Sequence, residues 1–243
     1  MTTIPLIMLP GLLCDHTVWT AQRAALADLA DSQIIDYGAL ESLPAMAALV
    51  LSQAPARFAL AGHSMGGRVA LEVMRQAPKR VAALALLDTG YQPRPLNDAG
   101  EAEKAQRQAL LDLAIAQGMR IMGRQWLQGM IYEKRLSDEP LVEEILRMIE
   151  RKTPAHFAAQ IQALLARPDA EPVLTTISCP TLVLCGREDR WSPLPRHEQM
   201  AALIPHSRLV AIDSCGHMST MERPDAVTAA MRNWLTDTVA GLA

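Results

Sequence analysis

The feature that most constrains the fold of this chain is a serine between glycines, Gly62-His63-Ser64-Met65-Gly66. An apolar run at residues 58–61 precedes it, and apolar residues recur at helical spacing after it. A serine at the apex of a sharp strand-to-helix turn takes a strained backbone, so the residues two before and two after it must lack a side chain. The turn exposes the hydroxyl at a helix N-terminus, which favours negative charge. The motif therefore predicts a nucleophile, with a glycine-rich structural turn as the competing interpretation.

The composition limits the class of protein. Its 243 residues, half of them hydrophobic, suit one large α/β domain or one domain with an insertion. A net charge of −3 and 4% aromatic residues argue against a nucleic-acid interface, and the apolar runs are too short to span a membrane. The segment Met1-Thr2-Thr3-Ile4 lacks a positive leader, and the four cysteines match neither a zinc site nor a disulfide framework. We expect a cytoplasmic protein with reduced thiols that acts on a small molecule without cofactor or metal, its oligomeric state left open.

Apolar runs alternate with helical patterns along the chain. Besides the run before Ser64, strands are predicted at Ile4–Leu9, Ile34–Tyr37, Val81–Leu87, Pro180–Gly186 and Arg208–Asp213. Most are apolar nearly throughout rather than alternating, which is typical of parallel strands covered on both faces. The alternation predicts an α/β fold with a parallel sheet and right-handed crossovers.

The middle of the chain has a different rhythm. Residues 93–172 show only helical patterns, and Asp98 and Asp138 are expected to cap two of the helices. We therefore expect a core made of residues 1–92 and 173–243, with 93–172 inserted as a helical lid. The methionines of the insertion either line an adaptable apolar pocket or pack the insertion against the core.

Three residues of complementary chemistry follow predicted strands. The carboxyl ends of parallel strands meet at one edge of a sheet, so Ser64, Asp189 and His217 are expected to converge there. A serine hydroxyl is a weak nucleophile and needs a base. His217 suits that task because its unperturbed pKa lies near 6.5. Asp189 would then hold the imidazole tautomer and stabilise its charged form.

Other residues compete for these roles. Asp88 also ends a strand and is the rival acid, whereas Asp213 lies too close to His217 along the chain. His63 adjoins the serine, but its side chain is expected to point away from the hydroxyl, and His16 is a candidate for lining the pocket. The remaining histidines are expected at the surface: His156, His197 and His206.

An oxyanion formed by attack on a carbonyl needs two donors aimed at one point. We expect the N–H of Met65, directly after the serine, and the N–H of Leu12, after Pro10-Gly11, to supply them. Both are backbone groups, so the identities of the side chains matter little.

With these residues placed, the chain resembles the α/β-hydrolase superfamily over essentially its whole length. Within it, the chain is similar to small lidded esterases and lactonases, which include pimeloyl-carrier-protein methyl esterases and the menaquinone-pathway synthase. The matching motifs are Pro10-Gly11 with Trp19, Gly62-His63-Ser64-Met65-Gly66-Gly67, Gly186-Arg187-Glu188-Asp189 with Pro193, and Gly216-His217. The resemblance implies an α/β-hydrolase fold, the triad, the lid and the two oxyanion donors.

Two departures from the family pattern stand out. Pro10 occupies the position where the family usually has a histidine, so a hydrogen-bonding imidazole is missing from the oxyanion loop. The chain also opens on the strand that precedes this loop, without the family's leading hairpin. We therefore expect about six strands in a mostly parallel sheet.

Three functions are compatible with these residues. The first is a serine hydrolase of carboxylic esters, lactones or thioesters, working through an acyl-enzyme on Ser64. The second is a lyase like the menaquinone-pathway synthase, or a carbon–carbon hydrolase, with the same triad. Arg68 follows Ser64 by four residues, as in that synthase, and Arg120 and Arg124 would add charge for an anionic substrate unless they are simply solvated. The third is a non-catalytic binding module on a hydrolase scaffold.

Overall fold

The computed structural model describes residues 3–242, and within them six strands form one sheet in the order β2-β1-β3-β4-β5-β6. The strands are β1 (Ile4–Leu9), β2 (Ala30–Ile34), β3 (Phe58–His63), β4 (Val81–Leu87), β5 (Thr181–Gly186) and β6 (Ser207–Ile212). Every neighbouring pair is parallel, so the predicted six-stranded parallel sheet is confirmed. Met1 and Thr2, on which the expectation of a missing leader partly rests, lie outside the described residues.

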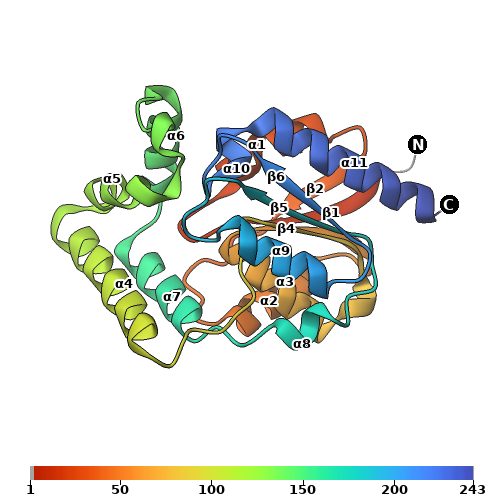
Figure 1. Ribbon diagram of the computed structural model, residues 1–243, viewed down its shortest axis with the longest axis horizontal. Coiled ribbons are helices and arrows are strands. Elements are labelled where there is room, and N and C mark those ends of the chain that lie inside the picture. The colour runs from red at the N-terminus through yellow and green to blue at the C-terminus, as the bar shows by residue number, and fades with distance from the viewer. Residues whose placement is uncertain (1–2, 243) are drawn as a thin grey trace.

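Helices cover both faces of the sheet (Figure 1). One face carries α2 (Leu43–Gln53), α3 (Met65–Gln76), α8 (Glu171–Leu174) and α9 (Leu194–Leu203), and the other carries α1 (Thr20–Ala25), α10 (Ser219–Glu222) and α11 (Pro224–Leu242). β3, β4 and β5 are buried along their whole length, and β1 nearly so. Burial on both faces explains why these strands read as continuous apolar runs.

Two sequence predictions about element boundaries were wrong. β2 occupies residues 30–34 rather than 34–37. It is an edge strand whose residues alternate between buried and exposed positions, so it contains polar residues and does not appear as an apolar run in the sequence. The first helix of the insertion is capped by Asn97 rather than Asp98, since the Asn97 side chain accepts a hydrogen bond from the Ala99 N–H. Asp138 caps its helix as predicted.

Residues 93–172, called the helical segment below, connect β4 to β5. They form α4 (Asp98–Gln117), α5 (Met119–Met130), α6 (Glu139–Glu150) and α7 (Pro154–Leu165) before the short α8. The four long helices gather beside one end of the sheet (Figure 1). The apolar face of α5 is buried, including Met122 and Trp126, which agrees with the predicted spacing.

The strand order reverses between β1 and β3. β2 lies on one side of β1, and β3 to β6 follow on the other side. At such a switch point the loops that leave two neighbouring strands diverge and open a crevice beyond their carboxyl ends. The loop after β1 and the turn at Ser64 flank this crevice.

Candidate active site

Ser64 occupies the strained turn between β3 and α3. Its φ of 55° and ψ of −116° lie in a region that L-residues rarely adopt. A side chain on Gly62 would overlap the carbonyl oxygen of Gly66, and one on Gly66 would overlap that of Leu9. The two glycines of the motif are therefore required for the turn to close against the end of β1, as the sequence predicted.

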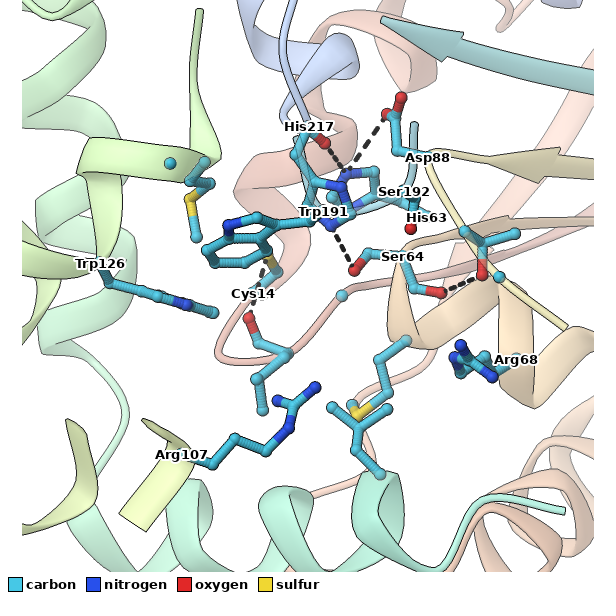
Figure 2. A pocket seen from close by; sticks show the side chains of 18 of the residues that line it. Cys14, His63, Ser64, Arg68, Asp88, Arg107, Trp126, Trp191, Ser192 and His217 are labelled. Carbon is cyan, nitrogen blue, oxygen red and sulfur yellow. Dashed lines mark hydrogen bonds and ion pairs between the residues drawn. The ribbon is translucent and has the colours of Figure 1, made fainter. Parts of the chain in front are cut away.

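Ser64, His217 and Asp189 form a continuous chain of hydrogen bonds. Figure 2 shows its first bond, between Ser64 and His217. Ser64 Oγ lies 2.7 Å from His217 Nε2, and His217 Nδ1 lies 2.8 Å from Asp189 Oδ2. The other carboxylate oxygen, Asp189 Oδ1, accepts hydrogen bonds from the N–H groups of Trp191 at 2.8 Å and Ser192 at 2.9 Å. The aspartate is thus fixed by its own loop while it orients the histidine.

The electrostatics of this chain favour a charged histidine. Burial disfavours the charged form of His217, but the charge of Asp189 and its hydrogen bond outweigh burial and raise the pKa of His217 above its usual value. Burial likewise opposes ionisation of Asp189, yet the His217 charge and hydrogen bonds hold the pKa of this carboxyl below its usual value. The pair can therefore stabilise an imidazolium formed when a proton leaves Ser64.

Neither rival carboxylate contacts His217. Asp88 is fully buried, accepts a hydrogen bond from the Gly186 N–H at 3.0 Å, and accepts another from the Ser219 hydroxyl. Burial, together with the nearby charge of Asp189, raises the pKa of Asp88 well above its usual value. Asp213 instead pairs with Arg187 at the surface. Of the three candidates, the structure brings Asp189 to the histidine.

Two expectations about the other histidines were wrong. His63 does not point away from the site: it lines the same cavity, and its Nε2–H donates to the carbonyl oxygen of His217 at 2.8 Å. Burial lowers the pKa of His63 to about 3, so it stays neutral and supports the His217 loop. His197 is buried rather than exposed, because its Nε2 accepts the Thr89 N–H at 3.0 Å. His16 is exposed and is not among the residues that line the cavity.

The two expected oxyanion donors lie beside the serine. Leu12 and Met65 both line the cavity with Ser64. Within residues 3–242, neither backbone N–H has an acceptor in the protein. Neither N–H is therefore committed to another group of the described protein. The loop around Leu12 closes on itself through the Cys14 N–H, which donates to the Gly11 carbonyl oxygen at 3.1 Å.

A buried glutamate that the sequence analysis did not single out holds the His217 loop. Glu222 is 1% exposed, and its carboxylate accepts hydrogen bonds from the N–H groups of Gly216 and Met218, on either side of the histidine. It also accepts the N–H of Tyr132 from the helical segment at 2.9 Å. Glu222 lies close to His217 in the sequence, but no sequence motif predicts its role because the groups it binds are backbone N–H groups.

The triad opens into a cavity of about 600 Å³. Its walls near the triad are aromatic: the Trp191 ring centroid lies 5.1 Å from that of His217 and 5.1 Å from that of Trp126 (Figure 2). Ser64, Trp126 and Trp191 line one cavity, so a group bound against the tryptophans would lie in the same cavity as the nucleophile.

The other end of the cavity is lined by arginines: Arg68, Arg107, Arg167 and Arg196. Glu103 also lines it, but it is bound by both Arg107 and Arg167. Among the described residues, Arg68 and Arg196 have no ion-pair partner. Burial and repulsion from its arginine neighbours lower the pKa of Arg68 to about 9. This end of the cavity therefore carries net positive charge.

Of the three arginines considered for an anionic substrate, Arg68, Arg120 and Arg124, only Arg68 lines the cavity, as an anion-binding role requires. Arg120 pairs instead with Glu143 and Glu150 on the helical segment, and Arg124 is exposed away from the cavity lining. The other cavity arginines come from helical patterns or loops that read like solvated surface in the sequence.

Within residues 3–242, no group of three or more His, Cys, Asp or Glu residues is placed to hold a metal ion. A search of the same residues for a helix long and apolar enough to cross a membrane also found none.

Comparisons with known proteins agree with this geometry. The model of the alpha/beta hydrolase family matches residues 6–230. The pimeloyl-[acyl-carrier protein] methyl ester esterase of Aromatoleum aromaticum is 28% identical over 191 residues, which cover 76% of each chain. A 2-hydroxy-6-oxo-6-phenylhexa-2,4-dienoate hydrolase of Comamonas testosteroni is 31% identical over 176 residues, 68% of this chain and 58% of that protein.

The solved structures include a similar enzyme as well. A thermophilic esterase from Thermogutta terrifontis, with malate bound, superposes with a TM-score of 0.84 and is 31% identical, over 98% of this chain and 91% of that one. The family match covers most of the chain, and the sheet, the serine turn and the strand order are those of the family. This chain therefore belongs to the alpha/beta hydrolase family.

Proposed function

We propose that this protein is a serine hydrolase of carboxylic esters, lactones or thioesters. Ser64 is the nucleophile, His217 is the general base, and Asp189 is the carboxylate that orients His217. The observation that carries the proposal is the hydrogen-bonded chain from Ser64 Oγ through His217 to Asp189, whose Ser64 end opens into a cavity large enough for a small acyl substrate. The esterases among its relatives support the same chemistry.

Each step follows from the position of these groups. Ser64 Oγ attacks the acyl carbonyl while His217 Nε2 takes its proton, and the oxyanion that forms accepts hydrogen bonds from the N–H groups of Leu12 and Met65. The imidazolium then gives the proton to the leaving alcohol or thiol. Water, activated by the same nitrogen, hydrolyses the acyl-enzyme and restores Ser64.

The helical segment is proposed to act as a lid over this reaction, with residues 1–92 and 173–243 as the core. Support comes from the cavity lining, to which α4 contributes Arg107, α5 contributes Trp126 and α7 contributes Leu164. A cytoplasmic location is part of the proposal too: the four cysteines are all free thiols, as in most cytosolic proteins.

Labelling and turnover together test the hydrolase. A fluorophosphonate should react with the wild-type protein at Ser64, and p-nitrophenyl esters of graded chain length should be hydrolysed. In Ser64→Ala we expect no labelling and a fall in kcat of at least about 10⁴-fold, because the nucleophile is lost. An unlabelled wild-type protein that hydrolyses none of these esters would favour the non-catalytic binding module instead.

A second candidate is carbon–carbon bond hydrolysis of an anionic substrate by the same triad. The arginine end of the cavity favours it, because unpaired and partly buried guanidinium groups suit a carboxylate. The relative that acts on a dienoate and the esterase that binds malate add support. The lyase alternative also remains, because Arg68 lines the cavity and suits an anionic substrate.

A substrate panel separates the candidates. Half-esters of dicarboxylic acids, neutral esters of equal length, 6-oxo-dienoates and the anionic substrate of the menaquinone-pathway synthase would be compared by kcat/KM. Preference for the half-esters indicates an ester hydrolase with an anion subsite. Turnover of the dienoates alone indicates the carbon–carbon hydrolase, and elimination from the synthase substrate indicates the lyase.

A further inference from the structure

One side chain of the helical segment reaches into the loop that carries the Leu12 donor. Gln160, on α7, is 1% exposed, and its Oε1 accepts a hydrogen bond from the Leu13 N–H at 2.9 Å. Its Nε2 donates to the carbonyl oxygen of Gly38 at 3.4 Å. The Leu13 N–H can only donate and the Gly38 carbonyl can only accept, so the two partners fix which way the amide points.

The backbone at Leu13 needs such a partner. Its φ of 58° is left-handed, which a bulky residue without glycine's freedom adopts only when its surroundings hold it there. Leu13 is fully buried, so its N–H would otherwise lose its hydrogen bond to water without replacement. Gln160 supplies that hydrogen bond across 147 positions of sequence.

The position of this contact in the loop gives it a consequence for the site. Leu12 stands between two fixed points: the Gly11 carbonyl, which accepts the Cys14 N–H at 3.1 Å, and the Leu13 N–H, which Gln160 accepts. The Gly11 carbonyl shares its peptide plane with the Leu12 N–H, and the Leu13 N–H belongs to the next peptide, so holding both groups fixes the direction of the Leu12 N–H. Leu12 lines the cavity together with Ser64, and its N–H has no acceptor among the described residues.

We propose that Gln160 is a positioning residue for the oxyanion hole. It acts through the Leu13 peptide to aim the Leu12 N–H at the oxygen that becomes negative, and so the helical segment contributes to transition-state stabilisation as well as to the cavity wall. This inference rests on the proposed serine hydrolase function.

A second contact of the helical segment anchors the far end of the same loop. Arg151 donates to both carboxylate oxygens of Asp15, at 2.7 and 3.1 Å, and to the Thr17 hydroxyl at 2.6 Å. This pair is partly exposed and holds residues that lie beyond Leu13. Of Arg151 and Gln160, only Gln160 binds the peptide next to the Leu12 N–H, so Gln160 is the residue to test.

Three variants of the full chain distinguish positioning from simple attachment of the helical segment. Gln160→Leu keeps the approximate shape but removes the acceptor. Gln160→Glu keeps an oxygen acceptor for the Leu13 N–H, and its protonated carboxyl, which burial favours, can donate to the Gly38 carbonyl as the amide does. Lys152→Met is the control, because it breaks the partly buried pair of Lys152 with Asp36 between the helical segment and the core, and among the described residues Lys152 makes no hydrogen bond to residues 10–15.

Steady-state kinetics on a p-nitrophenyl ester and inhibition by a trifluoromethyl ketone, whose hemiketal oxygen mimics the oxyanion, provide the readouts. In Gln160→Leu we expect kcat to fall about 10- to 100-fold, somewhat less than the loss of a whole donor, with KM within about twofold of wild type. The Ki of the ketone should rise by a similar factor. Gln160→Glu should recover most of both losses, and Lys152→Met should match wild type in both.

Two results would overturn the proposal. One is a Gln160→Leu protein with unchanged kcat and unchanged Ki. The other is equal impairment of Gln160→Glu and Gln160→Leu when thermal unfolding shows both folded. If Gln160→Leu does not fold, Gln160→Met takes its place with the same expectations. A wild-type protein that turns over no ester refutes the proposed function itself, whereas active wild type with active Gln160→Leu refutes only the role of Gln160.

Discussion

The two ends of the cavity differ in how they are built. At the triad end, Ser64, Asp189 and His217 come from loops that follow strands of one sheet, and each polar atom has a defined partner at 2.7 to 2.9 Å. At the other end, arginines from the core and from the helical segment line the cavity, and among the described residues the one glutamate there pairs only with Arg107 and Arg167 of the helical segment. The first end is complete within the protein, whereas the second has more positive charge than the protein neutralises. We infer that the Ser64 end of the cavity determines the reaction, and that the unpaired arginines at the other end determine which substrates bind.

The largest expected effect tests which carboxylate completes the triad end. Asp189→Asn should lower kcat by about 10⁴-fold, because a neutral amide no longer stabilises the imidazolium or enforces its tautomer. Asp88→Asn should lower kcat by less than about 10-fold, since its hydrogen bonds to Gly186 and Ser219 can be kept by an amide and it does not contact His217. Steady-state kinetics on one ester compare the two. A larger loss in Asp88→Asn would reassign the acid.

A smaller effect tests the arginine end. Arg68→Met should raise KM about 10- to 100-fold for a half-ester that carries a carboxylate, because a charge-assisted hydrogen bond is lost. It should leave a neutral ester of equal length nearly unchanged. Arg120→Met serves as control, since Arg120 pairs with glutamates outside the cavity. Equal losses on the neutral and the charged ester would show that Arg68 supports the fold near Ser64 rather than binding an anion.

The smallest effect is a shift in pH dependence. His217 must be neutral to take the proton of Ser64, and the Asp189 charge raises its pKa above the ordinary 6.5. The acidic limb of kcat/KM should therefore lie above pH 6.5, with activity lost as pH falls through it. In Asp189→Asn the residual activity should persist to lower pH, because burial then lowers the histidine pKa against only the weaker effects of Asp88 and Glu222. A limb that stays in place in this variant would mean that another group titrates.

The convergence of Ser64, Asp189 and His217 could be predicted from the sequence, and the reason is local. Ser64 sits in a motif whose glycines are dictated by one strained turn, and Asp189 and His217 each follow an apolar run that ends a buried strand. Parallel strands then bring these loops together without further information. Six strands were found for the same reason, although the polar edge strand β2 was misplaced.

The rest of the site could not be read in this way. Gln160 and Arg107 lie on helices whose polar residues look alike whether they face solvent or the cavity, and only the packing of the helical segment distinguishes the two. Glu222 accepts hydrogen bonds from backbone N–H groups, which every residue except proline has, so the sequence does not predict this contact. His197 is expected at the surface because it lies in a helical or connecting segment, and its actual partner, the Thr89 N–H, is a backbone group that the sequence does not reveal.

The most direct test of the central claim is to trap the covalent intermediate. The wild-type protein would be mixed with excess p-nitrophenyl ester, quenched with acid within the first turnovers, digested and examined by peptide mass spectrometry. We predict a mass increase equal to the acyl group on the peptide that contains Ser64, accompanied by an initial burst of p-nitrophenol when deacylation is slow. Sustained ester turnover with the acyl group on a different residue, or with no burst and no acylated peptide even under conditions that slow deacylation, would contradict the account.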